Sequence, residues 1–303
     1  MSHTPILIAG PTASGKSALA LHLAEEVGGA LINADSMQIY RGLTVLTAAP
    51  DEAERARAPH FLYEALDPSE RCSVGQWARM ATDALGEIKS QDLTPIFVGG
   101  TGLYFRALIQ GLASIPPIPE DVRTRADAAI AAEGAGWLLE DLSARDPETA
   151  SKLQPTDRQR IQRAWEVLEA TGQGLIAWQG EDDRPVLRGD VRQMVLAPPR
   201  DWIYERCNRR FDEMMDAGAP DEVRGLLARE LDPSLPAMKA LGVREIAAYL
   251  NGEMSLGESS EQAKMLTRRY AKRQMTWMRN QMGTWPRLDP SQDTFMEEAA
   301  SHL

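Results

Sequence analysis

The chain is poor in cysteine, in aromatic residues and in long apolar segments, and each shortage excludes a class of protein. Its two cysteines, Cys72 and Cys207, have neither the spacing of a metal-binding pair nor that of a redox pair. We therefore expect free thiols in a reducing compartment. No apolar segment is long enough to span a bilayer, and the run at residues 6–9 is too short for a signal peptide. These shortages predict a cytoplasmic protein that does not associate with a membrane.

Positive charge is scarce overall but concentrated in two places. The formal net charge is −11, which argues against nucleic-acid binding unless one face gathers the basic residues. Residues 262–288 contain no Asp or Glu and seven Lys or Arg, and a shorter cluster consists of Arg158, Arg160 and Arg163. A solvated helix face explains the shorter cluster as well as a binding surface does. The long acid-free stretch favours contact with a polyanion.

Strand and helix patterns alternate along the first hundred residues. Apolar runs at 5–9, 30–34 and 94–98 predict buried strands, and residues 17–27 and 74–89 predict helices between them. This alternation predicts an α/β fold with a doubly wound parallel sheet.

The pattern changes at the proline-rich segment 115–119, which marks a connector. From there to about Gln179 the sequence is helical without a clear strand; residues 191–197 resume a strand pattern, and 202–303 continue as a run of helices. We therefore predict a core formed by residues 1–114 and 190–303, and a small all-helical inserted domain at 115–189.

Residues 10–17, GPTASGKS, match the P-loop pattern GxxxxGK[ST] between a predicted strand and a predicted helix. Backbone N–H groups in such a loop bind a polyphosphate, Lys16 adds a positive charge, and the Ser17 hydroxyl can bind Mg²⁺. A glycine-rich turn without a ligand would not require the strand, the spacing and the helix together.

Two further features follow predicted strands. Asp35 lies at the carboxyl edge, where open α/β sheets bind ligands, and could take a proton from a nucleophile. An Asp that orients a metal or caps a helix would occupy the same position. Residues 97–104, FVGGTGLY, form a second glycine-rich turn, whose glycines could let the backbone approach a ligand and whose Thr101 could donate a hydrogen bond. Ordinary helix-start geometry would explain that turn as well.

Some signatures of other P-loop proteins are missing. None of the other predicted strands ends on an acid as a Walker-B strand does, and the sequence has no Asn-Lys-x-Asp signature of a GTPase.

Several blocks, taken together and in order, resemble one family across nearly the whole chain. The blocks are GPTASGKS at 10–17, INADSMQIYR at 32–41, VGGTGLYF at 98–105, RQRIQRA at 158–164, LPAMKALG at 235–242, Arg244 with Glu245, and YAKRQMTWM at 270–278. They resemble the tRNA isopentenyltransferases, also called the tRNA dimethylallyltransferase family.

The resemblance implies a P-loop NTPase-like core that transfers a dimethylallyl group from dimethylallyl diphosphate to a tRNA. The acceptor would be the N6 amine of the adenine adjacent to the anticodon on its 3′ side, diphosphate would be released, and Mg²⁺ would be the cofactor. The adenine would have to leave the base stack to react. We expect a monomer without an obligate protein partner.

The resemblance also implies roles for individual residues. Asp35 would accept the proton of the adenine amine, and Thr101 would donate to the bridging oxygen of the donor. The diphosphate would be held by Gly10, Thr12, Ala13, Ser14, Gly15, Lys16, Ser17 and Arg210, with Ser17 on the metal. The tRNA, through its anticodon stem-loop, would be contacted by Asp35, Ser36, Met37, Gln38, Thr101, Arg123, Gln159, Arg160, Ile161, Gln162 and Arg163. The inserted domain would thus contact the anticodon loop, and residues 262–288 would contact the RNA backbone.

The chain departs from the family at a few positions. Leu46 and Ala49 stand in LTAAP where members usually have GTAKP, Thr156 stands where Asn is common, and Val243 where Tyr is common. The missing lysine removes a positive charge near the site, so these departures concern affinity more than the type of reaction.

Two other interpretations remain. In a small-molecule or nucleoside kinase the P-loop would hold ATP and Asp35 would activate a hydroxyl, but the inserted domain and the basic C-terminal helices would have no role. In a non-catalytic tRNA-binding module the intact Lys16, Ser17, Asp35 and Thr101 would have no role.

Overall fold

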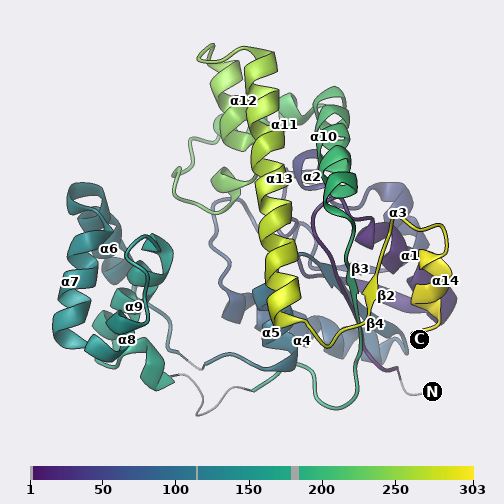
Figure 1. Cartoon of the computed structure of the whole chain (residues 1–303), viewed down its shortest axis with the longest axis horizontal. Coiled ribbons are helices and arrows are strands. Elements are labelled where there is room, and N and C mark those ends of the chain that lie inside the picture. Colours follow the sequence, from purple (N-terminus) through teal and green to yellow (C-terminus); the bar gives the residue numbers. More distant parts are fainter. Residues whose placement is uncertain (1–2, 114, 179–183) are drawn as a thin grey trace. The chain divides into compact units, whose positions relative to one another are not determined.

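The computed structural model describes residues 3–113, 115–178 and 184–303. The chain forms two compact units, one made of Met1–Ile109 and Val186–Leu303 and the other of Gln110–Pro185. We call them the core unit and the insertion unit (Figure 1). Residue 114, the predicted end of the first core segment, and Gln179, the predicted end of the helical region, lie outside the described residues.

A six-stranded sheet of order β3-β2-β4-β1-β5-β6 forms the centre of the core unit. Its strands are β1 (Ile6–Ala9), β2 (Gly29–Asn33), β3 (His60–Phe61), β4 (Thr94–Gly99), β5 (Arg192–Leu196) and β6 (Arg287–Leu288). Every pairing is parallel. Strands β1, β2 and β4 are buried along their whole length, which is why they are continuous apolar runs. The prediction of a parallel α/β sheet is confirmed.

Helices pack on both faces of the sheet because successive strand residues point to opposite sides. On one face Ile6, Ile8 and Leu31 join Leu19 and Leu23 of α1 (Lys16–Val27) in a buried cluster. On the other face Trp77 of α4 (Val74–Ser90) meets Phe97 edge-on at 6.4 Å and stacks on Tyr104 of α5 (Gly102–Ile109) at 4.0 Å. The two layers make the sheet doubly wound.

The remaining helices of the core unit lie mainly in its C-terminal half. They are α2 (Thr44–Thr47), α3 (Glu52–Arg57), α10 (Arg200–Asp216), α11 (Ala219–Leu227), the 3₁₀ turn η2 (Ala237–Lys239), α12 (Val243–Leu250), α13 (Leu256–Gln281) and α14 (Phe295–Ala300). The long helix α13 stands out in Figure 1. The prediction of helices alone after residue 202 is wrong at β6, which adds a two-residue edge strand beside β5. A pair of residues is too short to produce a recognisable alternation.

The insertion unit is helical, with α6 (Glu120–Glu133), α7 (Ala135–Arg145), α8 (Pro147–Ser151), α9 (Arg158–Thr171) and the 3₁₀ turn η1 (Leu175–Trp178). Its core contains Val122, Leu138, Ile161 and Trp165. In the part of the chain that the structure describes, no helix is long and apolar enough to cross a membrane.

Candidate active site

Three sequence motifs lie side by side because they follow three neighbouring strands. Residues 10–15 follow β1, Asp35 follows β2, and residues 100–101 follow β4, and β4 lies between β1 and β2 in the sheet. The carboxyl ends of parallel strands share one edge, so the motifs meet there.

Close packing and backbone conformation explain the glycines of the P-loop. Gly15 precedes α1 with φ of 89°, a left-handed conformation that favours glycine. A Cβ on Gly10 would lie 2.7 Å from the Ser14 hydroxyl, which is itself fully buried. Among the described residues the Ser14 hydroxyl has no hydrogen-bond partner. Such a loop is preformed to receive an anion.

The side chains beside the P-loop make the site strongly positive. Lys16 is 8% exposed, and its Nζ donates to the carbonyl oxygen of Pro11 at 3.3 Å. Burial lowers the pKa of Lys16 to about 8, while the charge of Asp35 opposes this shift and that of Arg210 adds to it. Burial also lowers the pKa of Arg210. A bound anion would offset the cost of burying these cations.

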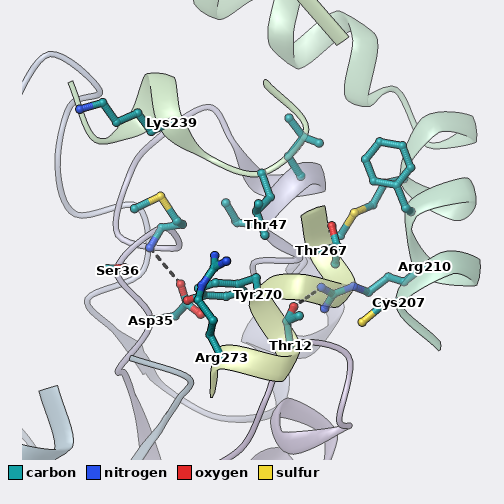
Figure 2. A pocket seen from close by; sticks show the side chains of 15 residues that line it. Thr12, Asp35, Ser36, Thr47, Cys207, Arg210, Lys239, Thr267, Tyr270 and Arg273 are labelled. Atoms are coloured by element: carbon teal, nitrogen blue, oxygen red, sulfur yellow. Dashed lines mark hydrogen bonds between the residues drawn. The ribbon is translucent and has the colours of Figure 1, made fainter. Parts of the chain in front are cut away.

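Two arginines of α10 hold the P-loop in place. Arg210 donates to the hydroxyl of Thr12, as Figure 2 shows, and Nε of Arg206 donates to the carbonyl oxygen of Ala13 at 2.9 Å. Arg206 also lies over the ring of Trp202. Arg210, which the resemblance implies is a diphosphate contact, thus lies beside the P-loop.

Two cavities of about 240 Å³ each open beside these residues. The P-loop cavity is lined by residues 13–18 and 48–50, among others. The Asp35 cavity is lined by Thr12, Asp35, Ser36, Met37, Leu46, Thr47, Cys207, Arg210, Phe211, Met214, Lys239, Leu241, Thr267, Tyr270 and Arg273 (Figure 2). Arg210 lines both cavities, so the two cavities adjoin at this residue.

Asp35 is held by its own neighbours. Its backbone N–H donates to Oδ1 of Asn33 at 2.7 Å, and Nδ2 of Asn33 donates back to its carbonyl oxygen at 2.9 Å. Oδ1 of Asp35 accepts the N–H of Met37 at 2.9 Å. No described residue donates to the second carboxylate oxygen, Oδ2. That oxygen is available to a ligand in the cavity.

Thr101 is joined to the Asp35 segment by two bonds. Its N–H donates to the carbonyl oxygen of Ala34 at 3.1 Å, and its hydroxyl oxygen accepts the N–H of Ser36 at 3.0 Å. Because the hydroxyl oxygen accepts here, its hydrogen is left to donate, although Thr101 is not among the residues that line either cavity.

Close packing against protein groups requires the glycines of the second turn. A Cβ on Gly99 would lie 2.1 Å from the backbone of Ala34, one on Gly100 would lie 2.1 Å from Nε2 of Gln274, and one on Gly102 would lie 2.4 Å from the Trp277 ring. These glycines therefore make room for protein groups.

Of the other predicted tRNA contacts in the core unit, Ser36 and Met37 line the Asp35 cavity. Gln38 is 8% exposed, and its Nε2 donates to the carbonyl oxygens of Thr47 and Ala48 at 2.9 and 2.8 Å. Its amide nitrogen thus supports the loop after α2.

The predicted contacts in the insertion unit lie mostly at its surface. Gln159, Arg160 and Arg163 of α9 are exposed, Gln162 and Arg123 are half-buried, and Nε2 of Gln162 donates to Asp127 and Glu166. Ile161 is fully buried in the core of this unit, which contradicts the prediction that its side chain contacts tRNA. An apolar residue on the inner face of an amphipathic helix packs inward.

The seven cations of the basic stretch 262–288 fall into three sets. Lys264 pairs with Asp212 at 2.7 Å and Arg268 donates to Asn208, so both attach α13 to α10 and do not serve as free contacts for RNA. Arg273 lies over Tyr270, and both line the Asp35 cavity. Arg269, Lys272, Arg279 and Arg287 are exposed.

Gln274, Tyr270 and Glu222 are site residues that the sequence patterns did not predict. Gln274 binds the P-loop backbone, Tyr270 lines the cavity with a pKa raised by burial and by the charge of Asp35, and Glu222 caps α2. The YAKRQMTWM block contained two of them, but no local pattern shows which of its residues face a site.

Ser17 is suitably placed for a metal-bound anion. It lies in the first turn of α1 and lines the P-loop cavity. Within the described ranges no group of three or more His, Cys, Asp or Glu could hold a metal. A cation here would take most of its ligands from a diphosphate and water, as Mg²⁺ commonly does.

Comparison with known proteins gives one consistent result. The model of the IPP transferase family matches residues 38–281, and that of the isopentenyl transferase family matches residues 4–60. The tRNA dimethylallyltransferase of Phenylobacterium zucineum is 54% identical over 93% of this chain and 91% of its own length, and that of Caulobacter sp. is 52% identical over 94% and 92%.

Two solved structures are similar over almost all of this chain. The tRNA isopentenylpyrophosphate transferase of Bacillus halodurans is 34% identical, with a TM-score of 0.69 and coverage of 99% of this chain and 95% of that one. A eukaryotic dimethylallyltransferase acting on tRNA is 27% identical, with a TM-score of 0.83 and coverage of 98% and 77%.

Proposed function

Because the chain belongs to the tRNA dimethylallyltransferase family, we propose that its P-loop cavity holds the allylic diphosphate and its Asp35 cavity holds the acceptor base of tRNA. The protein is a prenyltransferase that moves a dimethylallyl group to tRNA. The observation that carries the assignment of the two cavities is that Arg210 lines both, which brings the donor and the acceptor together.

In the donor half, the backbone N–H groups of residues 13–17 face the diphosphate, and Lys16 and Arg210 supply positive charge. As the C–O bond of the donor breaks, its electron pair stays on the diphosphate, and these groups stabilise the growing negative charge. The free hydrogen of the Thr101 hydroxyl donates to the bridging oxygen. Mg²⁺ held by Ser17 and the diphosphate oxygens would neutralise further charge.

In the acceptor half, the N6 amine of an adenine attacks the allylic carbon. The amine is a poor nucleophile because its lone pair is delocalised into the ring, so removal of its proton assists the new N–C bond. Oδ2 of Asp35, to which no described residue donates a hydrogen bond, accepts that proton. We place this adenine next to the anticodon on its 3′ side, extruded from the stack so that it reaches the cavity.

The remaining tRNA contacts are assigned by position. Arg123, Gln159, Arg160, Gln162 and Arg163 of the insertion unit would bind the anticodon stem-loop, and the exposed cations of α13 would bind phosphates. We propose that the enzyme acts in the cytoplasm as a monomer.

Transfer of label from radiolabelled dimethylallyl diphosphate to unmodified tRNA tests this function. Label in precipitated RNA with Mg²⁺ present, and on adenine after digestion to nucleosides, is the expected result. Absence of label together with phosphorylation of a small acceptor from ATP would instead support a kinase.

A further inference from the structure

Gln274 of α13 joins two loops that are far apart in the sequence. Its Oε1 accepts the N–H of Thr12 in the P-loop at 2.8 Å, and its Nε2 donates to the carbonyl oxygen of Gly100 at 3.0 Å. The side chain is 6% exposed, so water competes little for either bond. Gly100 immediately precedes Thr101. One side chain therefore ties the diphosphate loop to the turn that carries the Thr101 hydroxyl.

A side-chain amide suits this position for a chemical reason. The N–H of Thr12 needs an acceptor and the carbonyl oxygen of Gly100 needs a donor. A carboxylate only accepts, and Lys and Arg only donate, whereas an amide does both. The contact is also close, because a Cβ on Gly100 would lie 2.1 Å from Nε2 of Gln274. The amide of Gln274 therefore matches the two loops both in its hydrogen bonds and in its close packing against Gly100.

The same turn continues to the catalytic base. Thr101 accepts the N–H of Ser36 and donates its own N–H to Ala34, which flank Asp35. The contacts from Thr12 through Gln274, Gly100 and Thr101 thus connect the donor site to the base.

We propose that Gln274 is a positioning residue for the transfer reaction, which fixes the P-loop relative to Thr101 and Asp35. The proposal rests on the proposed function, because it takes the P-loop as the diphosphate site and Thr101 as the donor to the bridging oxygen. Gln274 itself touches neither substrate. Its effect comes from alignment, and a misplacement of about 1 Å in an active site can cost about 100-fold in rate.

Replacing Gln274 with leucine removes both hydrogen bonds and leaves an apolar side chain of similar size in place of the amide. We expect Gln274→Leu to lower kcat about 100-fold. The KM for dimethylallyl diphosphate should stay near that of the wild type, because the N–H groups of residues 13–17 and Lys16 still hold the diphosphate. A Gln274→Leu enzyme with wild-type kcat would overturn the proposal.

Ser259 provides a matched control on the same helix. It is fully buried, and its hydroxyl donates to the carbonyl oxygen of Glu245 at 2.8 Å, away from both cavities. Ser259→Ala should lower Tm but leave kcat unchanged. If Ser259→Ala reduced kcat as strongly as Gln274→Leu, loss of a buried bond in α13 would explain both, and the positioning role would be wrong.

Gln274→Glu gives a signature that a general loss of stability would not produce. Its carboxylate would repel the carbonyl oxygen of Gly100, but the protonated acid has one donor and one acceptor and restores both bonds. Burial raises the pKa of such a carboxyl, so protonation should begin in an accessible pH range.

The ratio of kcat for Gln274→Glu to that of the wild type should therefore rise as the pH falls, whereas the ratio for Gln274→Leu should stay constant. Any pH effect that is common to the wild type and the variants, such as titration of Lys16, cancels in these ratios. A flat ratio for Gln274→Glu would overturn the proposal. The wild-type enzyme is assayed before any variant. If it failed to label tRNA, that result would contradict the proposed function and not the role of Gln274.

Discussion

Glu222 of α11 caps α2 through Thr44: its Oε1 accepts the Thr44 hydroxyl at 2.7 Å. The same carboxylate accepts the backbone N–H of Val45 at 2.7 Å and that of Leu46 at 3.0 Å. A four-residue helix has few bonds of its own, so this carboxylate from another helix holds it in place. Leu46 and Thr47 of this helix line the Asp35 cavity. Glu222 therefore fixes one wall of the proposed acceptor site.

Glu222→Ala should lower the free energy of unfolding by about 2 kcal/mol, because three donors lose a charged acceptor. It should also raise the KM for tRNA as the cavity wall loosens. Denaturant unfolding and steady-state transfer kinetics measure the two effects. Glu213→Ala, at an exposed position on α10 outside both cavities, is the control and should change neither.

Asp35→Asn should reduce kcat by about 10²- to 10⁴-fold, the range that a general base contributes. The amide can still accept the N–H of Met37, so the loop should keep its shape. Calorimetric titration with dimethylallyl diphosphate should show nearly unchanged affinity, because the carboxylate serves the acceptor. A variant with near wild-type turnover would contradict the role of Asp35.

The pKa of Lys16 predicts a pH dependence of donor binding. Burial lowers that pKa to about 8, so the free enzyme carries the ammonium below pH 8 and loses it above. An anionic diphosphate binds the charged form, so affinity should be greatest below pH 8. Above pH 8 the affinity should decrease, and the decrease should approach about tenfold per pH unit. Titrations between pH 7.5 and 9.5 test this, and Lys16→Met should bind more weakly with a much flatter profile.

Arg160 and Arg163 should contribute to the binding of tRNA and not to the binding of dimethylallyl diphosphate. Replacing both with glutamine should weaken tRNA binding and reduce the salt dependence of the binding constant by about one unit of slope for each phosphate that an arginine no longer neutralises. Affinity for dimethylallyl diphosphate should not change. Lys152→Gln, an exposed lysine of the same unit that pairs with Glu148, is the control. Unchanged tRNA affinity in the double variant would contradict this placement of the anticodon loop.

The sequence predicted the parts of the site that depend on local order. The P-loop, Asp35 and the turn with Thr101 follow apolar runs, and parallel strands bring their carboxyl ends to one edge whatever the strand order. The strand order itself, with β4 between β1 and β2, depends on tertiary packing and could not be derived from the runs.

Other features depend on contacts across the chain. The long helix α13 begins at Leu256, where Ser255 and Glu258 form a capping box, a local pattern that is visible in the sequence. Gln274 and Glu222 could not be identified, because their partners, Thr12, Gly100 and Thr44, are distant in sequence and are mostly backbone groups that look alike in every residue.

Substitution of Ala49 tests whether the chain's departure from its family at this position lowers the enzyme's affinity for dimethylallyl diphosphate. It lines the P-loop cavity, at a position where the resemblance to the family led us to expect lysine. Ala49→Lys would add a positive charge near the diphosphate, worth about 1 kcal/mol or roughly fivefold in Kd at a partly exposed site. Tighter binding of dimethylallyl diphosphate, measured by calorimetry, is expected.

Ala53→Lys separates this local effect from a change in net charge. Ala53 is exposed on α3 and lines neither cavity, so the same charge there is screened by solvent. If both variants tightened binding equally, net charge would explain the gain. If Ala49→Lys had no effect, Lys16 and Arg210 would already supply the positive charge that the diphosphate requires, and the missing lysine would cost this enzyme nothing in donor affinity.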